Sequence, residues 1–464
     1  MPGAERPHYG LTMNYPVWEP PLLGGGLVIG IIAILHVFVS HFAVGGGLFL
    51  PLTERKAYRE NNPALLEYVK SHSTFFVLVT LVFGAVSGVG IWWAIGLVNP
   101  EATATLIHVF VWGWAIEWVF FLVEIAAAFI YYYGWDRLDA KTHLLVGWIY
   151  FVAAWLSLFV INGILAFMLT PGKWIEAPSF AAAFFNPGML PTCLIRTAVS
   201  VVLAGVYALL TASTIRDVAL RIDVVRYAAK WVLAGAVAIP FGALWYIAVL
   251  PPLAREIPAG AASAVTIFAA LSVFFSVLVV TFTYFGPYQH PRYFNLAFAV
   301  LIAVLSLSSL GVTEWVREAV RKPYIIYDYM YANTLRVADV ARVRQQGILK
   351  SALWVRQHAV DPERPEVSGR EVFRVQCASC HTVDGYNSIR FAVKGWGPEM
   401  IEYQLLHLNE LKAFMPPFVG SEAERVALRT WLLTLNPQPT IREPAHPGVQ
   451  AEVPAADRPG ATKP

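Results

Sequence analysis

The chain has 464 residues, of which 57% are hydrophobic and only 14% are charged, whereas soluble domains carry about a quarter charged residues. This balance over so long a chain excludes an ordinary soluble globular protein and predicts a polytopic membrane protein. The formal net charge of +3 is too small to indicate a nucleic-acid-binding protein.

Apolar stretches long enough to cross a bilayer recur along most of the sequence. Residues 1–20 are polar and Pro-rich and lack a basic segment before a short apolar core, so we expect no cleavable signal peptide. The first apolar stretch is then an uncleaved anchor. We expect about eight transmembrane helices, near residues 22–50, 73–98, 105–133, 143–169, 190–215, 227–250, 261–284 and 293–315.

Lysine and arginine are concentrated in alternate loops between these stretches. The other loops hold almost none, only Lys173 and Arg255. The positive-inside rule therefore places the basic loops in the cytoplasm and both termini on the outer side. The basic side chains are Arg55, Lys56, Arg59 and Lys70 after the first stretch, Arg137 and Lys141 after the third, Arg216, Arg221 and Arg226 after the fifth, and Arg292 after the seventh.

Two histidines lie within the first stretch, His36 and His41. Five residues correspond to about 140° around an α-helix, so the two imidazoles face different ways and one haem cannot take both. Polar groups at membrane depth are costly and are candidate functional groups. Either histidine could ligate a b-type haem, and the alternative for each is a hydrogen bond between packed helices.

The third stretch contains two carboxyl groups, Glu117 and Glu124. Seven residues are two helical turns, so both lie on one face, about 10 Å apart along the axis. Such a pair suits proton transfer or a distal position at a haem, and the alternative is hydrogen bonding between helices by neutral acids. We expect His108 to be interfacial, and Cys193 to be a buried small residue outside any disulfide.

Charged residues follow the last apolar stretch. The run from Glu314 to Tyr324 has two acids and three bases, and the pattern alone favours a solvated cap on the outer face. Residues 326–365 are expected to be a linker. Within it, apolar residues at helical spacing over 333–358 alternate with arginines and predict an amphipathic surface helix.

The sequence Cys377-Ala378-Ser379-Cys380-His381 is a C-x-x-C-H motif, typical of covalent attachment of a c-type haem. The two thiols would take the vinyl groups, and His381 would be the proximal iron ligand. A zinc site is the alternative, but no second Cys/His pair exists to complete one. We expect a small haem domain over 366–437, outside the cytoplasmic membrane, with helices at 369–376 and 422–435. Residues 438–464 are expected to be a disordered tail.

A low-spin c haem takes a second axial ligand, often methionine. Met415 lies between Phe414 and Pro416-Pro417, where a loop between two predicted helices could hold it. Met400 and His407 are competitors, and a surface methionine in a turn is the alternative. The order of helix, C-x-x-C-H, Met-Pro loop and closing helix resembles a class I cytochrome c.

About the first 325 residues resemble the haem-bearing subunit I of cytochrome bd oxidases. His36, followed by an apolar run, Gly45 and Leu52-Thr53-Glu54, resembles the first-helix haem-ligand segment of that family. The resemblance implies that His36, rather than His41, is the axial ligand of the oxygen-reactive haem.

Further motifs support the same resemblance. Glu117 and Glu124 fall on the family's Ile-Glu and Leu-Glu positions, although their spacing differs by one residue. The run 134–138 matches its Gly-Trp-Asp-Arg-Leu motif unbroken, and Asn162-Gly163 and Pro171-Gly172 also match. Glu318, with Arg321, Pro323 and Tyr324, resembles a stretch whose glutamate ligates a second, high-spin b haem. The resemblance thus makes Glu318 a haem ligand, with Arg321 beside it, instead of part of a solvated cap.

The sequence also departs from that family. Arg196 stands where the family has the histidine ligand of its low-spin b haem, and the methionine partner of that haem has no counterpart in 266–270. The long outer loop that binds quinol is reduced to 251–258, and a ninth helix is missing. We hypothesise that electrons enter through the c haem instead of from quinol. Arg196 would then contact a haem propionate, or else extend toward the outer membrane face.

We therefore expect an all-α polytopic membrane bundle with a small C-terminal cytochrome c domain, in the bacterial cytoplasmic membrane. The function we expect is reduction of O2 to water by a bd-type terminal oxidase subunit. Electrons from a periplasmic donor such as a cytochrome c would pass from the Cys377/Cys380 haem to the Glu318 haem and then to the His36 haem, with protons travelling by Glu117 and Glu124.

Several features stay open at this level. We expect one covalent haem c and one or two haems b, with haem d as the alternative at His36, and the family implies a second membrane subunit. One rival function is an electron-transfer and anchoring subunit of a larger respiratory complex without oxygen chemistry. Another is a reductase of a different small molecule such as nitric oxide.

Overall fold

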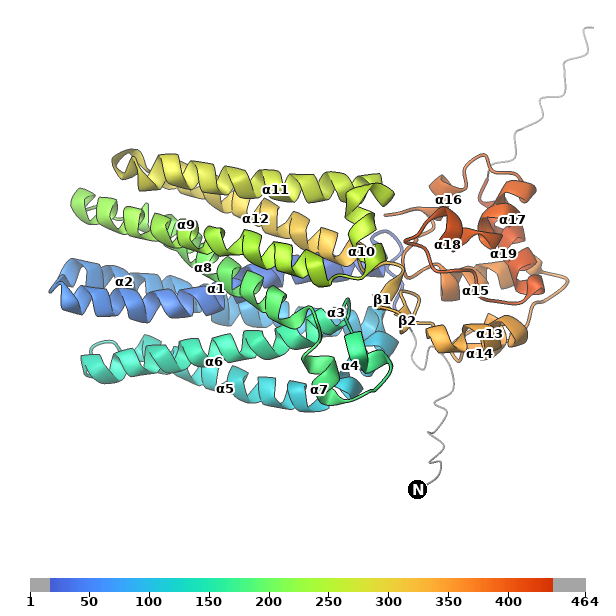
Figure 1. The fold of residues 1–464 in the computed structure, drawn as a ribbon, viewed down its shortest axis with the longest axis horizontal. Helices are drawn as coiled ribbons and strands as arrows, with labels where there is room; N and C mark the ends of the chain where they lie inside the picture. Colours follow the sequence, from blue (N-terminus) through green and yellow to red (C-terminus); the bar gives the residue numbers. More distant parts are fainter. Residues whose placement is uncertain (1–16, 437–464) are drawn as a thin grey trace, which may run out of the picture.

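The structure is a computed structural model that describes residues 17–436. In this range, eight helices are long and apolar enough to cross a membrane, and they run side by side as one bundle (Figure 1). They are α1 (Gly24–Arg59), the continuous helix Pro63–Val98 (α2 Pro63–Val77, η1 Leu78–Gly84, α3 Ala85–Val98), α5 (Val111–Gly134), α6 (Ala140–Phe167), α8 (Met189–Ala212), α9 (Val218–Val249), α11 (Ser263–Thr283, continued by η4 Tyr284–Tyr288) and α12 (Leu296–Ala319).

The helices begin where the sequence supplies an N-cap. Side-chain oxygens of Asn62, Asp139, Asp217 and Asn295 accept backbone N–H groups in the first turns of α2, α6, α9 and α12. Each cap satisfies an amide that the helix itself leaves unpaired, typically contributing about 1 kcal/mol. These caps all precede helices that start at the same end of the bundle, so they fix the loops there.

Helix α1 lies among its neighbours and packs against α6 and α8 through glycines. A Cβ atom on Gly45 would lie 1.8 Å from the Ser200 carbonyl oxygen of α8, and one on Gly47 would lie 2.3 Å from the Tyr150 ring of α6. Small residues let membrane helices approach this closely, and dispersion contacts then hold them together. The first helix is therefore the element against which the others are placed.

Two boundaries differ from the expected apolar stretches. The third stretch is interrupted at Phe110, which has non-helical dihedrals (φ −117°, ψ 29°), so His108 lies on the short α4 (Pro100–Val109) and not on α5. The last stretch continues as helix to Ala319, which places Glu314 and Glu318 in the final turns of α12. Short elements lie at the end of the bundle where α12 stops: η2 (Gly172–Ile175), α7 (Phe180–Phe184), α10 (Pro252–Glu256) and η3 (Ile257–Ala261). A further short helix, η5 (Pro291–Tyr293), lies in the α11–α12 loop.

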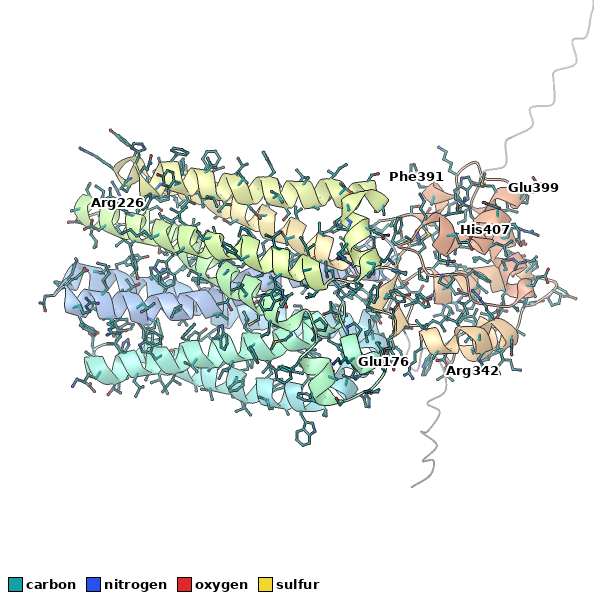
Figure 2. The ribbon with its side chains drawn as sticks, viewed as in Figure 1. Glu176, Arg226, Arg342, Phe391, Glu399 and His407 are labelled. Carbon is teal, nitrogen blue, oxygen red and sulfur yellow. The ribbon has the colours of Figure 1, made fainter. Side chains whose placement is uncertain are left out.

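The number of spans is even, so α1 begins and α12 ends at the same end of the bundle. The C-terminal part of the chain lies at this end, which we call the near end (Figure 1). Arg226 lies at the opposite, far end, and Glu176 lies near the C-terminal part (Figure 2).

The expected single helix over 333–358 is replaced by shorter elements. After a hairpin of β1 (Tyr324–Ile326) and β2 (Met330–Tyr331), the chain forms η6 (Val337–Asp339), α13 (Val340–Gln346) and α14 (Ile348–Ser351). Gly347 ends α13 because its φ of +91° is left-handed. Val343, Ile348 and Leu349 are buried in the core of the C-terminal part, so the apolar face of this segment is used there.

The remaining C-terminal elements are α15 (Pro365–Gln376), α16 (Ile389–Ala392), α17 (Pro398–Leu406), α18 (Leu408–Leu411) and α19 (Glu422–Thr434). Helices α15 and α19 agree with the expected opening and closing helices. They cross closely, because a Cβ on Gly369 would lie 2.0 Å from the Ala427 carbonyl oxygen, and the rings of Phe373 and Trp431 are 4.7 Å apart. The expected tail lies outside the described residues.

Candidate functional site

The C-x-x-C-H motif forms the turn that follows α15. The Cys377 amide donates to the Phe373 carbonyl (2.8 Å), and the His381 amide donates to the Cys377 carbonyl (2.9 Å). Cys377 and Cys380, three residues apart in a helical turn, therefore face the same side. Both thiols are free, as is the buried Cys193.

His381 is held in a definite tautomer. Its Nδ1 donates to the carbonyl oxygen of Asn387 (3.0 Å), which leaves Nε2 as the acceptor nitrogen. The Asn387 side chain in turn donates to the Cys380 carbonyl (2.8 Å) and its φ is +52°. Burial lowers the pKa of His381, although the hydrogen bond to Asn387 opposes this, so the imidazole is neutral, the form that ligates iron.

Met415 lies in the loop between α18 and α19, with its amide bonded to the Lys412 carbonyl (2.8 Å). The competing residues lie on α17 or at its end. The Met400 sulfur accepts from Gln404, and His407 Nδ1 bonds to the Tyr403 carbonyl of its own helix, which leaves Nε2 available as it does in His381. Met415 as the second axial ligand stays a prediction.

The haem-motif loop packs directly on the first turn of α1. The Tyr386 amide donates to the Leu22 carbonyl (2.7 Å), and a Cβ on Gly385 would lie 2.0 Å from that same oxygen. A Cβ on Gly26 would lie 3.9 Å from the Ser379 carbonyl oxygen, between the two cysteines. The run Gly24-Gly25-Gly26 thus leaves room for the motif at the near end.

Charged residues gather where α12 ends, close to the same loop. Glu318 pairs with Arg321 and with Lys322 (3.2 Å), and Lys322 is near enough to Cys380 to interact with it electrostatically. One turn earlier, Arg317 donates to Glu314 (2.8 Å). Glu318 therefore lies between the membrane bundle and the C-x-x-C-H motif.

A cavity at the near end is lined by three guanidinium groups, those of Arg196, Arg317 and Arg321, together with Asn162 and Tyr246. Arg321 is 6% exposed, and its Nε has no hydrogen-bond partner among the described residues. A buried donor without a partner costs about 1–3 kcal/mol unless an acceptor occupies the site. An acceptor in this cavity would satisfy Arg321 Nε, and the three arginines, of which Arg317 and Arg321 also pair with glutamates, suit an anionic one.

The two histidines of α1 lie deeper in the bundle and have different surroundings. Ser87 donates to the Phe83 carbonyl (2.7 Å), so its oxygen accepts from His36 Nδ1 (3.1 Å), which leaves His36 Nε2 available. His41 is 3% exposed, bonds through Nδ1 to the Val37 carbonyl, and lies within electrostatic reach of Arg196 and Glu314. The helix turns them to different sides, as their spacing predicts.

The two glutamates of α5 both face α6. Ser157 donates to Glu117 (3.0 Å), and Tyr150 donates to Glu124 (2.9 Å). The residues thus form one row of polar groups along the α5–α6 contact, about two helical turns long.

Comparisons with known proteins match the membrane bundle and the C-terminal part of the chain to two different families. Residues 27–250 match the family model of cytochrome bd terminal oxidase subunit I, and residues 365–432 match cytochrome C oxidase, cbb3-type, subunit III. The chain joins a cytochrome bd subunit I domain to a cytochrome c domain. The predicted family, fold class and electron-transport role are thereby confirmed, and the bd match ends at residue 250, before the expected 325.

A solved structure gives the same fold for the bd domain. The bd oxidase from Geobacillus thermodenitrificans is 16% identical, with a TM-score of 0.57, and the match covers 66% of this chain and 88% of that chain. None of the curated proteins compared with this chain matches it.

Haem cofactors are implied by both domains, and the residues present fit them. In the cytochrome c domain, two free thiols and a neutral His381 with Nε2 available suit a covalently held haem. In the bd domain, the unpartnered Arg321 Nε and the neighbouring guanidinium groups suit haem propionates.

Sequence reasoning missed one polar cluster of the bd domain. At the far end, Glu54, Tyr131 and His143 are joined by hydrogen bonds and are almost fully buried. In the sequence, Glu54 stands at the end of a motif and His143 begins an apolar stretch. Two ionisable residues near helix ends are a weak signal for a shared site, because only the packing of α1 on α6 brings them together.

Proposed function

We propose that this chain is a bd-type terminal oxidase subunit that reduces O2 to water with electrons received through its cytochrome c domain. The observation that carries the proposal is the contact between the C-x-x-C-H loop and the bd domain. Leu22, just before α1, accepts a hydrogen bond from the Tyr386 amide of this loop, and a Cβ on Gly26 would lie 3.9 Å from its Ser379 carbonyl oxygen. Lys322 beside Glu318 approaches Cys380. A donor that reduces the cytochrome c domain would therefore deliver electrons next to the bd domain.

Each group of residues has a role in this proposal. Cys377 and Cys380 would tether the c haem, His381 and Met415 would ligate its iron, and Glu318 and His36 would hold the two haems of the bd domain. Arg196 and Arg321 would bind propionates, and His41 is the alternative ligand on α1. When bound, the haems supply electron transfer and, at His36, the binding and reduction of O2. Haem b or haem d fits the requirement at His36.

Protons for water formation would be carried by Glu117 and Glu124, because both carboxyls lie in the α5–α6 contact and have hydroxyl partners. A second membrane subunit would cover the exposed apolar helices. A periplasmic donor such as a cytochrome c would dock on the cytochrome c domain, which places the near end outside the cytoplasmic membrane. The short segment 251–258 supports the absence of a quinol site.

A CO-difference spectrum of the purified protein tests the oxidase function. We expect a CO-reactive high-spin haem, together with O2 uptake driven by reduced cytochrome c and not by quinol. No CO-reactive haem would instead support an electron-transfer and anchoring subunit. Fast O2 uptake driven by quinol alone would contradict the entry of electrons through the cytochrome c domain.

The ligand assignment has its own test. We expect His36→Ala to lose one haem of the bd domain while the c-haem signal stays, because His36 Nε2 is available for iron. A pyridine haemochrome count measures both haem types in one sample. The matched variant His41→Ala should keep the haem, and unchanged haem content in His36→Ala would refute the assignment.

A further inference from the structure

The far end of the bundle contains a buried ionisable cluster for which the proposed function has no role. Glu54 of α1, Tyr131 of α5 and His143 of α6 are 0%, 4% and 2% exposed. Three helices therefore meet around one carboxyl group. A buried ion pair is often no more stable than a well-packed apolar contact, so stability alone does not account for this cluster.

The hydrogen bonds define how many protons the cluster holds. Tyr131 donates its hydroxyl to Glu54 Oε2 (2.7 Å), and His143 Nε2 faces the Tyr131 carbonyl oxygen (2.9 Å). A carbonyl oxygen only accepts, so Nε2 carries a hydrogen. His143 Nδ1 faces Glu54 Oε1 at 2.8 Å. One further proton must lie between these two atoms, because without it a carboxylate would face an imidazole lone pair.

This proton can occupy either partner with little movement of heavy atoms. On His143 it gives an ion pair, and on Glu54 it gives two neutral groups. The ion pairs of the described residues give Glu54 no lysine or arginine partner, so His143 is its sole cationic neighbour there. The rings of Tyr131 and Trp135 pack against the His143 ring in tilted arrangements, each with its centroid 4.2 Å from that of His143.

A small cavity beside this cluster is lined by two tyrosines and otherwise by apolar side chains and glycines. Its lining includes Tyr131 on one side and Tyr150, which donates to Glu124, on the other. Glycines leave room for the two rings, since a Cβ on Gly147 would lie 3.0 Å from the Tyr131 ring and one on Gly47 would lie 2.3 Å from the Tyr150 ring. Glu124 is seven residues before Tyr131, about 10 Å along α5.

We propose that Glu54 and His143 form a proton-storing pair that loads Glu124 from the far end of the bundle. Tyr131, which donates to Glu54 and lines the cavity, connects the pair to this space, and a water molecule between Tyr131 and Tyr150 would carry the stored proton to the Tyr150–Glu124 pair. A proton from the far-end solvent then replaces it, so charge and protons balance. The destination at Glu124 rests on the proposed function, whereas the one-proton state of the pair does not.

The experiment measures proton uptake when the haems are reduced anaerobically, with a pH-indicator dye in detergent solution. We expect Glu54→Gln to slow uptake about tenfold or more, as losing a positioned proton donor does. Glutamine can still accept from Tyr131 and donate to His143, so the fold and the haem content should be retained. The control His108→Asn changes an exposed histidine that bonds only to the Ala104 carbonyl of its own helix, and should leave uptake unchanged.

Two outcomes would overturn the proposal. One is wild-type uptake in Glu54→Gln, and the other is loss of the same uptake in His108→Asn. An infrared difference spectrum gives a second measurement, in which Glu54→Gln must remove a carboxyl or carboxylate band that changes on reduction. Neither measurement requires O2, so a missing CO-reactive haem would refute the oxidase function without touching this result.

Discussion

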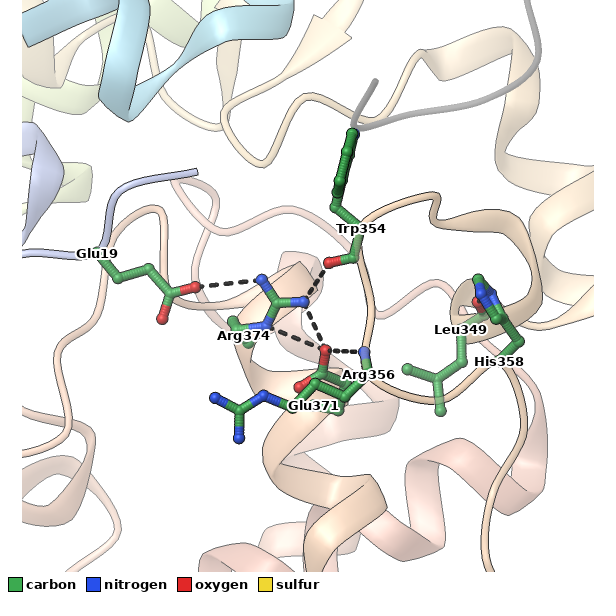
Figure 3. Close-up of polar contacts among 7 residues, drawn as sticks. All are labelled: Glu19, Leu349, Trp354, Arg356, His358, Glu371 and Arg374. Atoms are coloured by element: carbon green, nitrogen blue, oxygen red, sulfur yellow. Dashed lines mark hydrogen bonds and ion pairs between the residues drawn. The ribbon is translucent and has the colours of Figure 1, made fainter. Parts of the chain in front are cut away.

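At the residue scale, the half-buried Arg374 links the buried Glu371 to two other segments of the chain. Its guanidinium donates to the Glu371 carboxylate, to the Trp354 carbonyl and to Glu19 of the segment before α1, the last at 3.4 Å (Figure 3). The Arg356 amide donates to the same Glu371 carboxylate (2.9 Å). Glu371 is 6% exposed, and hydrogen bonds to a charged group at such a site contribute about 1.5–3 kcal/mol.

This cluster predicts a dependence of stability on pH. Burial raises the pKa of Glu371, but the hydrogen bonds from Arg374 and the Arg356 amide outweigh it, so the pKa lies below its ordinary value of 4.5. A depressed acid pKa stabilises the fold above the ordinary value and loses this contribution as pH falls through the folded value. Thermal unfolding followed by c-haem absorbance should show Glu371→Gln less stable by about 1.5–3 kcal/mol at pH 7.

The difference between wild type and Glu371→Gln should shrink toward zero as the pH falls below 4.5. The control Glu399→Gln changes an exposed carboxyl on α17 and should follow the wild-type curve (Figure 2). A pH-independent loss of stability in Glu371→Gln would show that packing, and not charge, holds the site.

At the element scale, α1 joins the functional parts of the chain. It begins under the C-x-x-C-H loop, carries His36 and His41, and ends with Glu54. Its position depends on glycine contacts with neighbouring helices. Gly45 is required for packing against α8, whereas Gly30 of the same helix has no atom within 4 Å of its Cβ position.

These two glycines give a matched pair of variants. We expect Gly45→Ala to destabilise the bd domain by about 1–3 kcal/mol or more, because its Cβ would lie 1.8 Å from the Ser200 carbonyl oxygen, which cannot move without α8. A haemochrome count should then show bd-domain haem reduced and c haem retained. Gly30→Ala has no atom within 4 Å of its Cβ and should keep full haem content. Equal haem loss in both would mean that helix flexibility, and not contact, matters.

Elements defined by local chemistry could be predicted from the sequence, and contacts between distant residues could not. Hydropathy located all eight spanning helices. It missed the break at Phe110, where no proline or glycine marks the change, and the division of 333–358 at Gly347. The Glu54–His143 pair could not be predicted, because the partners are 89 residues apart in the sequence. The haem motif could be predicted because its two cysteines and its histidine lie within five consecutive residues.

At the scale of the whole molecule, the proposed electron route and the proposed proton route reach the bd domain from opposite ends. The cytochrome c domain lies on the near end and Arg226 at the far end (Figures 1 and 2). The Glu54–His143 pair lies toward the far end too, because Glu54 is close to the end of α1 and His143 is in the first turn of α6. His36 is ten residues after Gly26, about 15 Å along α1 from the haem-motif loop. Under the proposed function, electrons enter from one side and protons from the other, and both meet between α1 and its neighbours.

If electrons pass from the cytochrome c domain to the bd domain, their transfer depends on the close contact between the cytochrome c domain and the start of α1. Gly385→Ala tests it, because the new Cβ would lie 2.0 Å from the Leu22 carbonyl oxygen and would push the domain away from the bundle. We expect both haem types to be retained, while the reduction of bd-domain haem by a small reductant of the c haem slows severalfold in stopped-flow spectra. Gly397→Ala, on the same domain with no atom within 4 Å of its Cβ, should behave as wild type. Wild-type transfer in Gly385→Ala would show that electrons reach the bd domain by a route other than this contact.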